Sequence, residues 1–332
     1  DSPEVTDLAG YRNRYALYKS DPLLQASHAA HPWIVTWDDH EVDNDHAGLS
    51  TEDGQDVEAF RVRRSAAYQA WWEHQPVRLE PPTGGPYRIH RTLSWGTLAD
   101  IHMLDGRQYR DPTPTDGEPV ELGGAEGFDI RRLGPTALDP DHSMLGDEQE
   151  VWLIDAVGSS TATWQLLGNQ VFMHGLNAFP IGVPATAPDT WDGYAGNRKR
   201  LLEALSPGRD IVVLTGDFHS TSVADVRPDP FDRESPIVAA ELMAPAISSR
   251  FPDALRELAP LVTLANPQIR FFDPDNGFIV CEVDESRVTA EVRTLADVTD
   301  ENSAVSTAAR VTIDAGSPGI ASVSIPEVIP DA

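Results

Sequence analysis

Two short polar segments of the sequence combine carboxylates with histidine at spacings that suit metal binding. The first is the acidic run Trp37–Asp45, and the second is Thr215–Ser220, in which Asp217 and His219 are two residues apart. In an extended segment, residues i and i+2 point to the same side, so these two side chains can reach one ligand. Carboxylates and imidazoles together suit hard or borderline di- or trivalent cations. We therefore expect one metal site that draws on both segments.

Each segment also has a simpler structural interpretation. Because Asp and Asn shape turns through hydrogen bonds to the backbone, Asp38–Asp45 can be a solvated acidic turn that caps a helix. The segment Gly216–His219 can be a strand-to-helix turn with an N-capping aspartate. Both segments, however, directly follow apolar runs typical of buried strands, Trp33–Trp37 and Ile211–Thr215. Open α/β sheets assemble ligand sites at such strand ends, which favours the metal site.

Hydrophobic periodicity and turn residues predict the elements that must hold these segments. Strands alternate with helices, which indicates a layered α/β or α+β domain. Residues 111–145, rich in Pro, Gly and Asp, are expected to form a long surface loop that can act as a lid. The other predictions are helices over 7–31, 56–73, 148–157 and 190–205, strands over 100–104, 164–173 and 237–243, and hairpins within 84–98 and 277–294.

Composition limits the classes of function. The 332 residues carry 53 Asp and Glu against 25 Lys and Arg, a net charge of −28, which argues against nucleic-acid binding because that needs a basic surface. No run approaches the ~18 apolar residues of a membrane-spanning helix, so an integral membrane protein is not expected. An anionic substrate would be repelled unless bound cations offset the charge. The single Cys281 excludes an internal disulfide and lies in an apolar run that predicts a small buried side chain.

The sequence Trp-Asp-Asp-His-Glu-Val at 37–42, with Leu-Thr-Gly-Asp-Phe-His-Ser at 214–220, resembles the PhoD-like alkaline phosphatase and phosphodiesterase family of metallophosphoesterases. The resemblance implies an α/β fold, a four-layer α/β/β/α sandwich with two mixed sheets. It places the family domain at 1–295. Residues 296–332, rich in Ser, Thr, Ala and Val, are expected to form short strands and a tail of the same domain. Further similar segments lie at 11–19, 104–110, 168–171 and 266–271.

The resemblance also implies roles for the polar residues. Asp39 takes the place of an asparagine metal ligand of the superfamily. His40 takes the place of the histidine that steadies the transferring phosphoryl group or the leaving oxygen, so it is the candidate catalytic residue. Asp217 and His219 match a pair of side chains that both bind metal, and Asp38 is a further candidate ligand.

Four residues are weaker candidates for substrate binding. Asp105 and Arg107 end a predicted strand, and arginine suits bidentate binding of phosphate oxygens; a structural ion pair is the alternative. Asn169 and Gln170 lie where the superfamily often carries another histidine ligand. His174 follows a predicted strand and can therefore approach the site.

The function implied by the resemblance is a secreted, metal-dependent phosphoric ester hydrolase that uses Fe³⁺ with Ca²⁺ or another divalent ion to activate water. One alternative is a phospholipase D-type phosphodiesterase that acts on phospholipid or lysophospholipid headgroups. An apolar loop near the site would favour it, and Phe179–Val183 is the candidate. A second alternative is a non-catalytic fragment that binds metal or phosphate.

The family pattern includes two earlier motifs, an Asp beside Cys or His and a Gly-Asp-x-x-Tyr element that supplies a bridging Asp. Neither precedes residue 7, and Gly146-Asp147 has no tyrosine after it. A two-metal centre needs more ligands than the later motifs provide. The sequence therefore predicts that an amino-terminal fragment of the same protein completes the site and adds a strand beside Trp33–Trp37.

Overall fold

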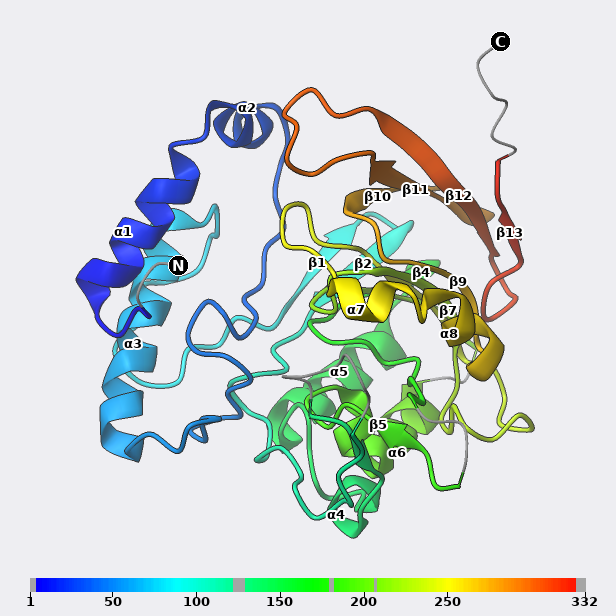
Figure 1. Cartoon of the computed structure of the whole chain (residues 1–332), viewed down its shortest axis with the longest axis horizontal. Helices are drawn as coiled ribbons and strands as arrows, with labels where there is room; N and C mark the ends of the chain where they lie inside the picture. Colours follow the sequence, from blue (N-terminus) through cyan, green and yellow to red (C-terminus); the bar gives the residue numbers. More distant parts are fainter. Residues whose placement is uncertain (1–3, 122–128, 179–181, 206–207, 327–332) are drawn as a thin grey trace.

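A seven-stranded mixed sheet forms the centre of the computed structural model, which describes residues 4–121, 129–178, 182–205 and 208–326 (Figure 1). Strands β2, β4, β6 and β8 are parallel neighbours, and β1, β7 and β9 are antiparallel to theirs. The central strands are almost wholly buried because both faces of the sheet are covered. In spatial order the strands are β1 (Arg91–Trp95), β2 (Ala99–Met103), β4 (Trp164–Gly168), β6 (Asp210–Thr215), β8 (Ala239–Met243), β7 (Thr221–Val226) and β9 (Ile269–Asp273).

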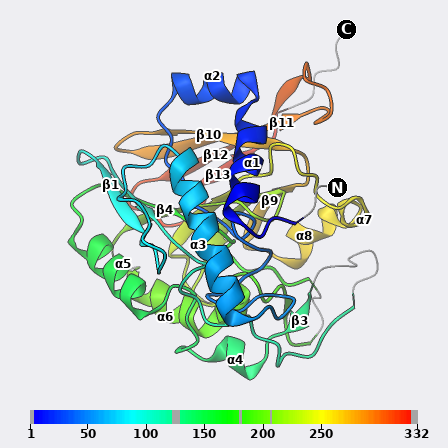
Figure 2. The same ribbon diagram turned by 90° about the vertical axis from the view of Figure 1, so that its left-hand side faces the viewer.

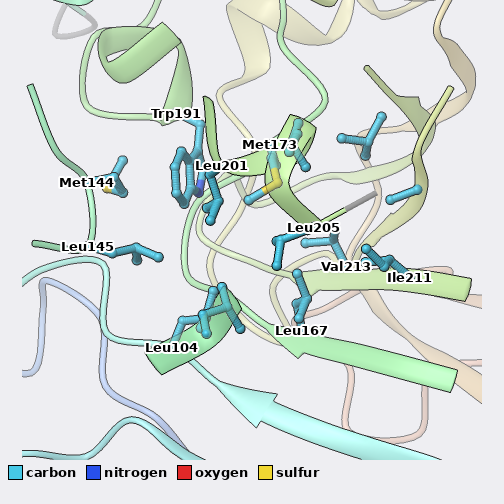
Figure 3. Packing of buried hydrophobic residues seen from close by; sticks show 14 of the residues in the cluster. Leu104, Met144, Leu145, Leu167, Met173, Trp191, Leu201, Leu205, Ile211 and Val213 are labelled. Atoms are coloured by element: carbon cyan, nitrogen blue, oxygen red, sulfur yellow. The ribbon is translucent and has the colours of Figure 1, made fainter. Parts of the chain in front are cut away.

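Each face of this sheet has its own hydrophobic core. Helices α5 (Asp147–Ser159) and α6 (Ala195–Leu205) cover one face, where Leu167, Leu201 and Val213 pack together (Figure 3). The other face packs against a second sheet. The two cores account for three of the four expected layers, and the second outer helix layer stays a prediction.

The second sheet consists of β10 (Gly277–Val283), β11 (Arg287–Leu295), β12 (Val305–Asp314) and β13 (Ser322–Ser324). All of its pairings are antiparallel, so the expectation of two mixed sheets is wrong for this one. The reason is local, because short connections join consecutive strands only in antiparallel order. The hairpin predicted over 277–294 is confirmed. The prediction that Cys281 is buried is wrong, because β10 is an edge strand and leaves this side chain exposed.

Helices α1 (Leu8–Lys19), α2 (Pro22–Ala30) and α3 (Val57–His74) lie together at one side of the sheets (Figures 1 and 2). The single helix predicted over 7–31 is two helices, because Pro22 has no N–H and starts a new one. The carboxylate of Asp21 caps α2 by accepting from the backbone N–H groups of Leu23 and Leu24. The helix predicted over 56–73 is confirmed as α3, with Asp56 as its N-cap.

The segment Trp33–Trp37 is extended but forms no β-ladder with any described strand, so the predicted buried strand is wrong. Side chains hold it instead: Thr36 Oγ1 donates to the carbonyl of Leu104 at 2.9 Å, and Arg91 donates to the carbonyl of Val35 at 2.8 Å. The Trp37 ring stacks on Tyr68 of α3, with the ring centroids 4.1 Å apart. The apolar run therefore joins the α1–α3 core instead of the sheet.

The remaining elements are short. Residues 111–145 contain the described elements β3 (Arg131–Arg132), paired with β5 (Ala185–Thr186), and α4 (Pro135–Leu138). The 3₁₀ turn η1 (Trp191–Tyr194) precedes α6, and α7 (Asp253–Arg256) and α8 (Ala259–Ala265) precede β9. The strand predicted over 164–173 ends early, at Gly168. Within the described ranges, no helix has the length and apolar character needed to cross a membrane.

Candidate metal centre

The two polar segments meet in space. Each of Asp38, Asp39 and Asp217 offers one carboxylate oxygen, and these three oxygens lie within 4.8 Å of one another. Asp217 follows the carboxyl end of β6, and the aspartate pair follows the extended segment packed on α3. Three candidates separated by nearly 180 positions in the sequence therefore form one acidic cluster, which we call the carboxylate cluster.

A tight turn orients Asp39. Its carboxylate accepts hydrogen bonds from the backbone N–H groups of His40 at 2.7 Å and Asp45 at 3.0 Å. Burial opposes ionisation of this group, but the positive charge of Arg107 and these N–H groups hold its pKa below the ordinary value. Asp39 is therefore a fixed, ionised carboxylate. The side chain of His40, one residue on, is exposed, and its predicted catalytic role stays a prediction.

The turn after β6 has an uncommon backbone. Asp217 and His219 have φ values of +68° and +52°, in the left-handed region that costs non-glycine residues of order 1–3 kcal/mol each. Backbone bonds hold the turn, including the bond from Gly216 N–H to the carbonyl of Gln170 at 3.2 Å. The expectation of an extended segment is wrong here. His219 is half-buried and lies outside the carboxylate cluster, so its predicted role as a metal ligand stays a prediction.

Arg107 lies at the centre of the acidic groups with a fully buried side chain. Its Nε donates to Asp38 at 2.6 Å, and its two Nη groups donate to Asp189 at 2.7 Å and to Asp217 at 3.3 Å. Arg110 also pairs with Asp189. The structural ion pair that we considered for Arg107 is thus present, and its predicted contact with phosphate stays a prediction.

Sequence reasoning missed Asp189. It lies in the irregular stretch between β5 and η1, outside any motif. The only available signal was indirect, since buried arginines need acidic partners.

Negative charge exceeds positive charge at this place. The three carboxylates of the cluster and Asp189 face the two guanidinium groups of Arg107 and Arg110. Burial and the neighbouring carboxylates raise the pKa values of Asp38 and Asp217 above their ordinary range. A hard cation would relieve this repulsion, and carboxylate oxygens are the ligands such cations prefer. The residues present therefore fit a metal site.

The other substrate-binding candidates are buried, and their hydrogen bonds join the segments around the cluster. Asp105 accepts from the backbone N–H groups of Arg107 and Gln108 at 3.1 and 2.9 Å. Gln170 accepts from Gly106 N–H at 3.0 Å and donates to the carbonyl of Trp37 at 3.0 Å. These two residues thus position the loop that carries Arg107.

Asn169 donates to the carbonyl of Val171 at 2.6 Å and lies at the end of β4. The proposed substrate contacts of Asp105, Asn169 and Gln170 stay predictions.

A second buried polar group lies beneath the turn after β6. Glu241 of β8 is fully buried and accepts hydrogen bonds from Met173 N–H at 2.9 Å, His174 N–H at 2.7 Å and Thr215 Oγ1 at 2.8 Å. Its carboxylate also lies 2.7 Å from His174 Nδ1. His174 therefore sits in this network, not in the carboxylate cluster. A glutamate inside the otherwise apolar run of β8 was the signal that sequence reasoning overlooked.

Comparisons with known proteins identify the family and the fold of the chain. The family model described as PhoD-like phosphatase matches residues 1–292. The chain is 38% identical over 328 residues to Alkaline phosphatase D of Bacillus subtilis (strain 168), covering 98% of this chain and 54% of that protein. A solved structure described as PhoD is similar with a TM-score of 0.87 and 34% identity, covering 99% of this chain and 62% of that one. The chain thus spans little more than half the length of this curated relative.

Proposed function

The chain belongs to the PhoD-like phosphatase family, and we propose that it hydrolyses phosphoric esters with the help of bound metal ions. The resemblance seen in the sequence and the mixed α/β fold class are both confirmed by these matches. The observation that carries the proposal is the convergence of Asp38, Asp39 and Asp217 within 4.8 Å. Similarity to a relative described as an alkaline phosphatase supports the ester class.

In this proposal, Asp38, Asp39 and Asp217 hold the metal, with His219 as a further ligand. A metal held there would lower the pKa of bound water and offset charge on the phosphoryl oxygens. Fe³⁺ with Ca²⁺ or another divalent ion is the proposed set, and the oxygen-rich cluster suits hard cations.

The protein groups around the cluster have separate tasks. Arg107 keeps Asp38 and Asp217 at a fixed spacing through its two charge-assisted hydrogen bonds. His40 is exposed beside Asp39, where its ring can donate a proton to the leaving oxygen or steady an equatorial oxygen of the phosphoryl group. Glu241 anchors Thr215 and so holds the turn that carries Asp217.

The finer expectations remain proposals. Hydrolysis of phospholipid headgroups and secretion stay predictions of the family resemblance. A non-catalytic role and an amino-terminal partner fragment stay predictions that follow from the two motifs absent before residue 7. Of the apolar loop predicted over Phe179–Val183, residues 179–181 lie outside the described residues, so the loop stays a prediction.

The test is to measure metal content and hydrolysis in the same preparation. Purified chain is analysed for metals by mass spectrometry and assayed with 4-nitrophenyl phosphate and bis(4-nitrophenyl) phosphate, with and without chelator. Asp217→Asn is the test variant, and Asp155→Asn, an exposed aspartate on α5, is the matched control. Loss of metal and rate in the first variant alone supports the proposal. Full activity of metal-free chain contradicts it, and bound metal without hydrolysis of either ester indicates the non-catalytic alternative.

A further inference from the structure

Asp189 lies beside the carboxylate cluster and joins two buried arginines. One oxygen of its carboxylate accepts from Arg107 Nη1 at 2.7 Å, and the other pairs with Arg110. Its backbone carbonyl accepts a further bond from Arg110, from Nη1 at 2.9 Å. Both arginine side chains are fully buried, whereas the side chain of Asp189 is 18% exposed. Because a buried guanidinium is stable only with an acidic partner, this single residue neutralises part of the charge on both.

The fold itself fixes the backbone that carries Asp189. Trp191, two residues on, is fully buried and lies beside Leu201 in the core under helices α5 and α6 (Figure 3). Tyr194, at the end of η1, donates to the carbonyl of Asp111 at 2.7 Å, in the segment that contains both arginines. Asp189 is therefore held by the core on one side and by the arginine-bearing segment on the other, which gives its carboxylate a defined position.

The guanidinium of Arg107 divides its donors between Asp189 and the carboxylate cluster. Nε donates to Asp38 at 2.6 Å, and Nη2 donates to Asp217 at 3.3 Å and lies 3.9 Å from Asp39. A guanidinium and a metal ion compete for the same carboxylate oxygens, because both are cations. Since Asp189 engages Nη1, the guanidinium cannot turn this nitrogen toward the cluster. The pair therefore keeps Arg107 from occupying further oxygens of the cluster.

Asp189 also adds negative charge next to the carboxylate cluster. When all groups are ionised, the three carboxylates of the cluster exceed the two guanidinium groups by one charge, and Asp189 raises the excess to two. A nearby negative charge attracts a di- or trivalent cation, and burial reduces the screening by salt. Residues that orient or support metal ligands from outside commonly change metal affinity by about 10–100-fold. Position and charge therefore both predict that Asp189 strengthens metal binding.

We propose that Asp189 is a positioning residue for the metal that the carboxylate cluster binds. It fixes the guanidinium of Arg107 and supplies part of the negative charge that attracts the cation, without contacting the metal itself. The inference rests on the proposed function, because it requires a metal at this cluster. It deepens that proposal by assigning a task to the turn between β5 and η1, which lies outside the motifs identified in the sequence.

The experiment measures metal affinity without catalysis. Ca²⁺ is titrated by isothermal calorimetry into metal-free wild-type chain and into Asp189→Asn, which removes the charge but keeps the shape of the side chain. The variant should bind Ca²⁺ about 10–100-fold more weakly. Asp189→Glu restores the charge and should recover most of the lost affinity. Equal affinities of the wild type and Asp189→Asn overturn the inference, and an Asp189→Glu variant that binds no better than Asp189→Asn overturns the role of the charge.

Asp192→Asn is the matched control. Asp192 lies in η1, three residues after Asp189, and its carboxylate pairs with the buried side chain of Arg198. Breaking this pair should lower the melting temperature in chelator but leave the Ca²⁺ affinity of the folded chain unchanged. Circular dichroism shows whether each variant is folded at the titration temperature; if Asp192→Asn is not, Asp225→Asn, which breaks an ion pair with Arg270, takes its place. A control that loses as much affinity as Asp189→Asn overturns the inference.

Asp217→Asn separates this inference from the proposed function. If the wild type binds no Ca²⁺, or binds it only as tightly as Asp217→Asn does, the metal site and with it the proposed function fail. If Asp217→Asn loses Ca²⁺ binding and Asp189→Asn keeps it, only the inference fails. Hydrolysis of bis(4-nitrophenyl) phosphate gives a second measurement: Asp189→Asn should regain the wild-type rate when Ca²⁺ is raised to saturation, because the candidate ligands are intact. A rate that stays low at saturation overturns a role limited to metal binding.

Discussion

Two buried acidic groups lie close to Thr215, at the end of β6: Glu241, and the carboxylate cluster that contains Asp217. Their surroundings differ. Glu241 is one carboxylate that accepts from two backbone N–H groups and the hydroxyl of Thr215, with His174 Nδ1 2.7 Å away. Two residues beyond Thr215, Asp217 shares a single guanidinium with its acidic neighbours. At Glu241, hydrogen-bond donors of the protein satisfy the buried carboxylate. In the carboxylate cluster, the aspartates outnumber the guanidinium groups of Arg107 and Arg110 that pair with them.

The difference separates a structural carboxylate from a functional one. A buried carboxylate is stable when hydrogen bonds from the protein satisfy its oxygens, as they do at Glu241. Like charges held within 4.8 Å raise one another's pKa and favour a bound cation. Loss of Glu241 should therefore weaken the fold, whereas loss of Asp217 should weaken the chemistry.

The largest effect is expected from Asp217→Asn on catalysis. Removing a candidate ligand should reduce the rate of bis(4-nitrophenyl) phosphate hydrolysis about 1,000-fold, equivalent to about 4 kcal/mol in the barrier. In chelator the melting temperature should not fall, because one of the crowded negative charges is gone. Asp155→Asn is the control and should match the wild type in both assays. A rate within tenfold of wild type would remove Asp217 from the site.

Glu241→Gln should have the opposite profile. The neutral amide cannot accept from all the donors around Glu241, so the free energy of unfolding should fall by about 3–5 kcal/mol. Urea denaturation with and without chelator measures this, and the loss should be the same in both. Glu291→Gln, a partly exposed glutamate on β11, is the control. Wild-type stability of Glu241→Gln would mean that the two acidic places do not differ in kind.

Adding metal tests whether the carboxylate cluster, and not Glu241, binds a cation. A cation at 100 times its Kd should stabilise the folded wild type by about 2.7 kcal/mol. Asp217→Asn should lose most of that gain, whereas Glu241→Gln should keep it on a lower baseline. Thermal melts over a metal titration give both quantities. Equal gains in the wild type and Asp217→Asn would place the bound metal elsewhere.

The smallest expected effect is on the pH dependence of stability and comes from His90. This buried histidine has neither the hydrogen-bond partners of Glu241 nor the neighbouring carboxylates of Asp217. Both ring nitrogens lack partners in the described part of the chain, and burial, assisted by Arg88, lowers its pKa to about 4. The unfolded chain has the ordinary pKa of ~6.5 and takes up a proton first, so stability is retained above that pH and falls as the pH drops toward 4.

His90→Phe removes this titration. Its melting temperature should fall about 2–5 °C less than that of the wild type between pH 7.5 and pH 5. His31→Phe alters an exposed histidine and serves as the control. Identical pH profiles for all three proteins would show that burial without partners does not matter at this position.

Local patterns predicted much of the fold. The strands at Ile211–Thr215 and Ile237–Met243, helix α3 and the hairpin at 277–294 follow from apolar runs and periodicity, and the structure contains them. The strand predicted at Trp33–Trp37 was wrong for a physical reason. An apolar, β-branched run looks the same whether it enters a sheet or packs on a helix, and here it packs on α3 through Trp37.

Residue types and motif spacing were enough to indicate the family and the two segments that form the carboxylate cluster. These properties are local, so they can be seen in the sequence alone. The positions of Asp189 and Glu241 relative to the carboxylate cluster could be known only from the folded chain. Each depends on which distant segments pack together: Asp189 is near Arg107 only because the loop before η1 folds over it. His219 shows the same limit, since the left-handed turn after β6, and not the two-residue spacing, sets where its side chain lies.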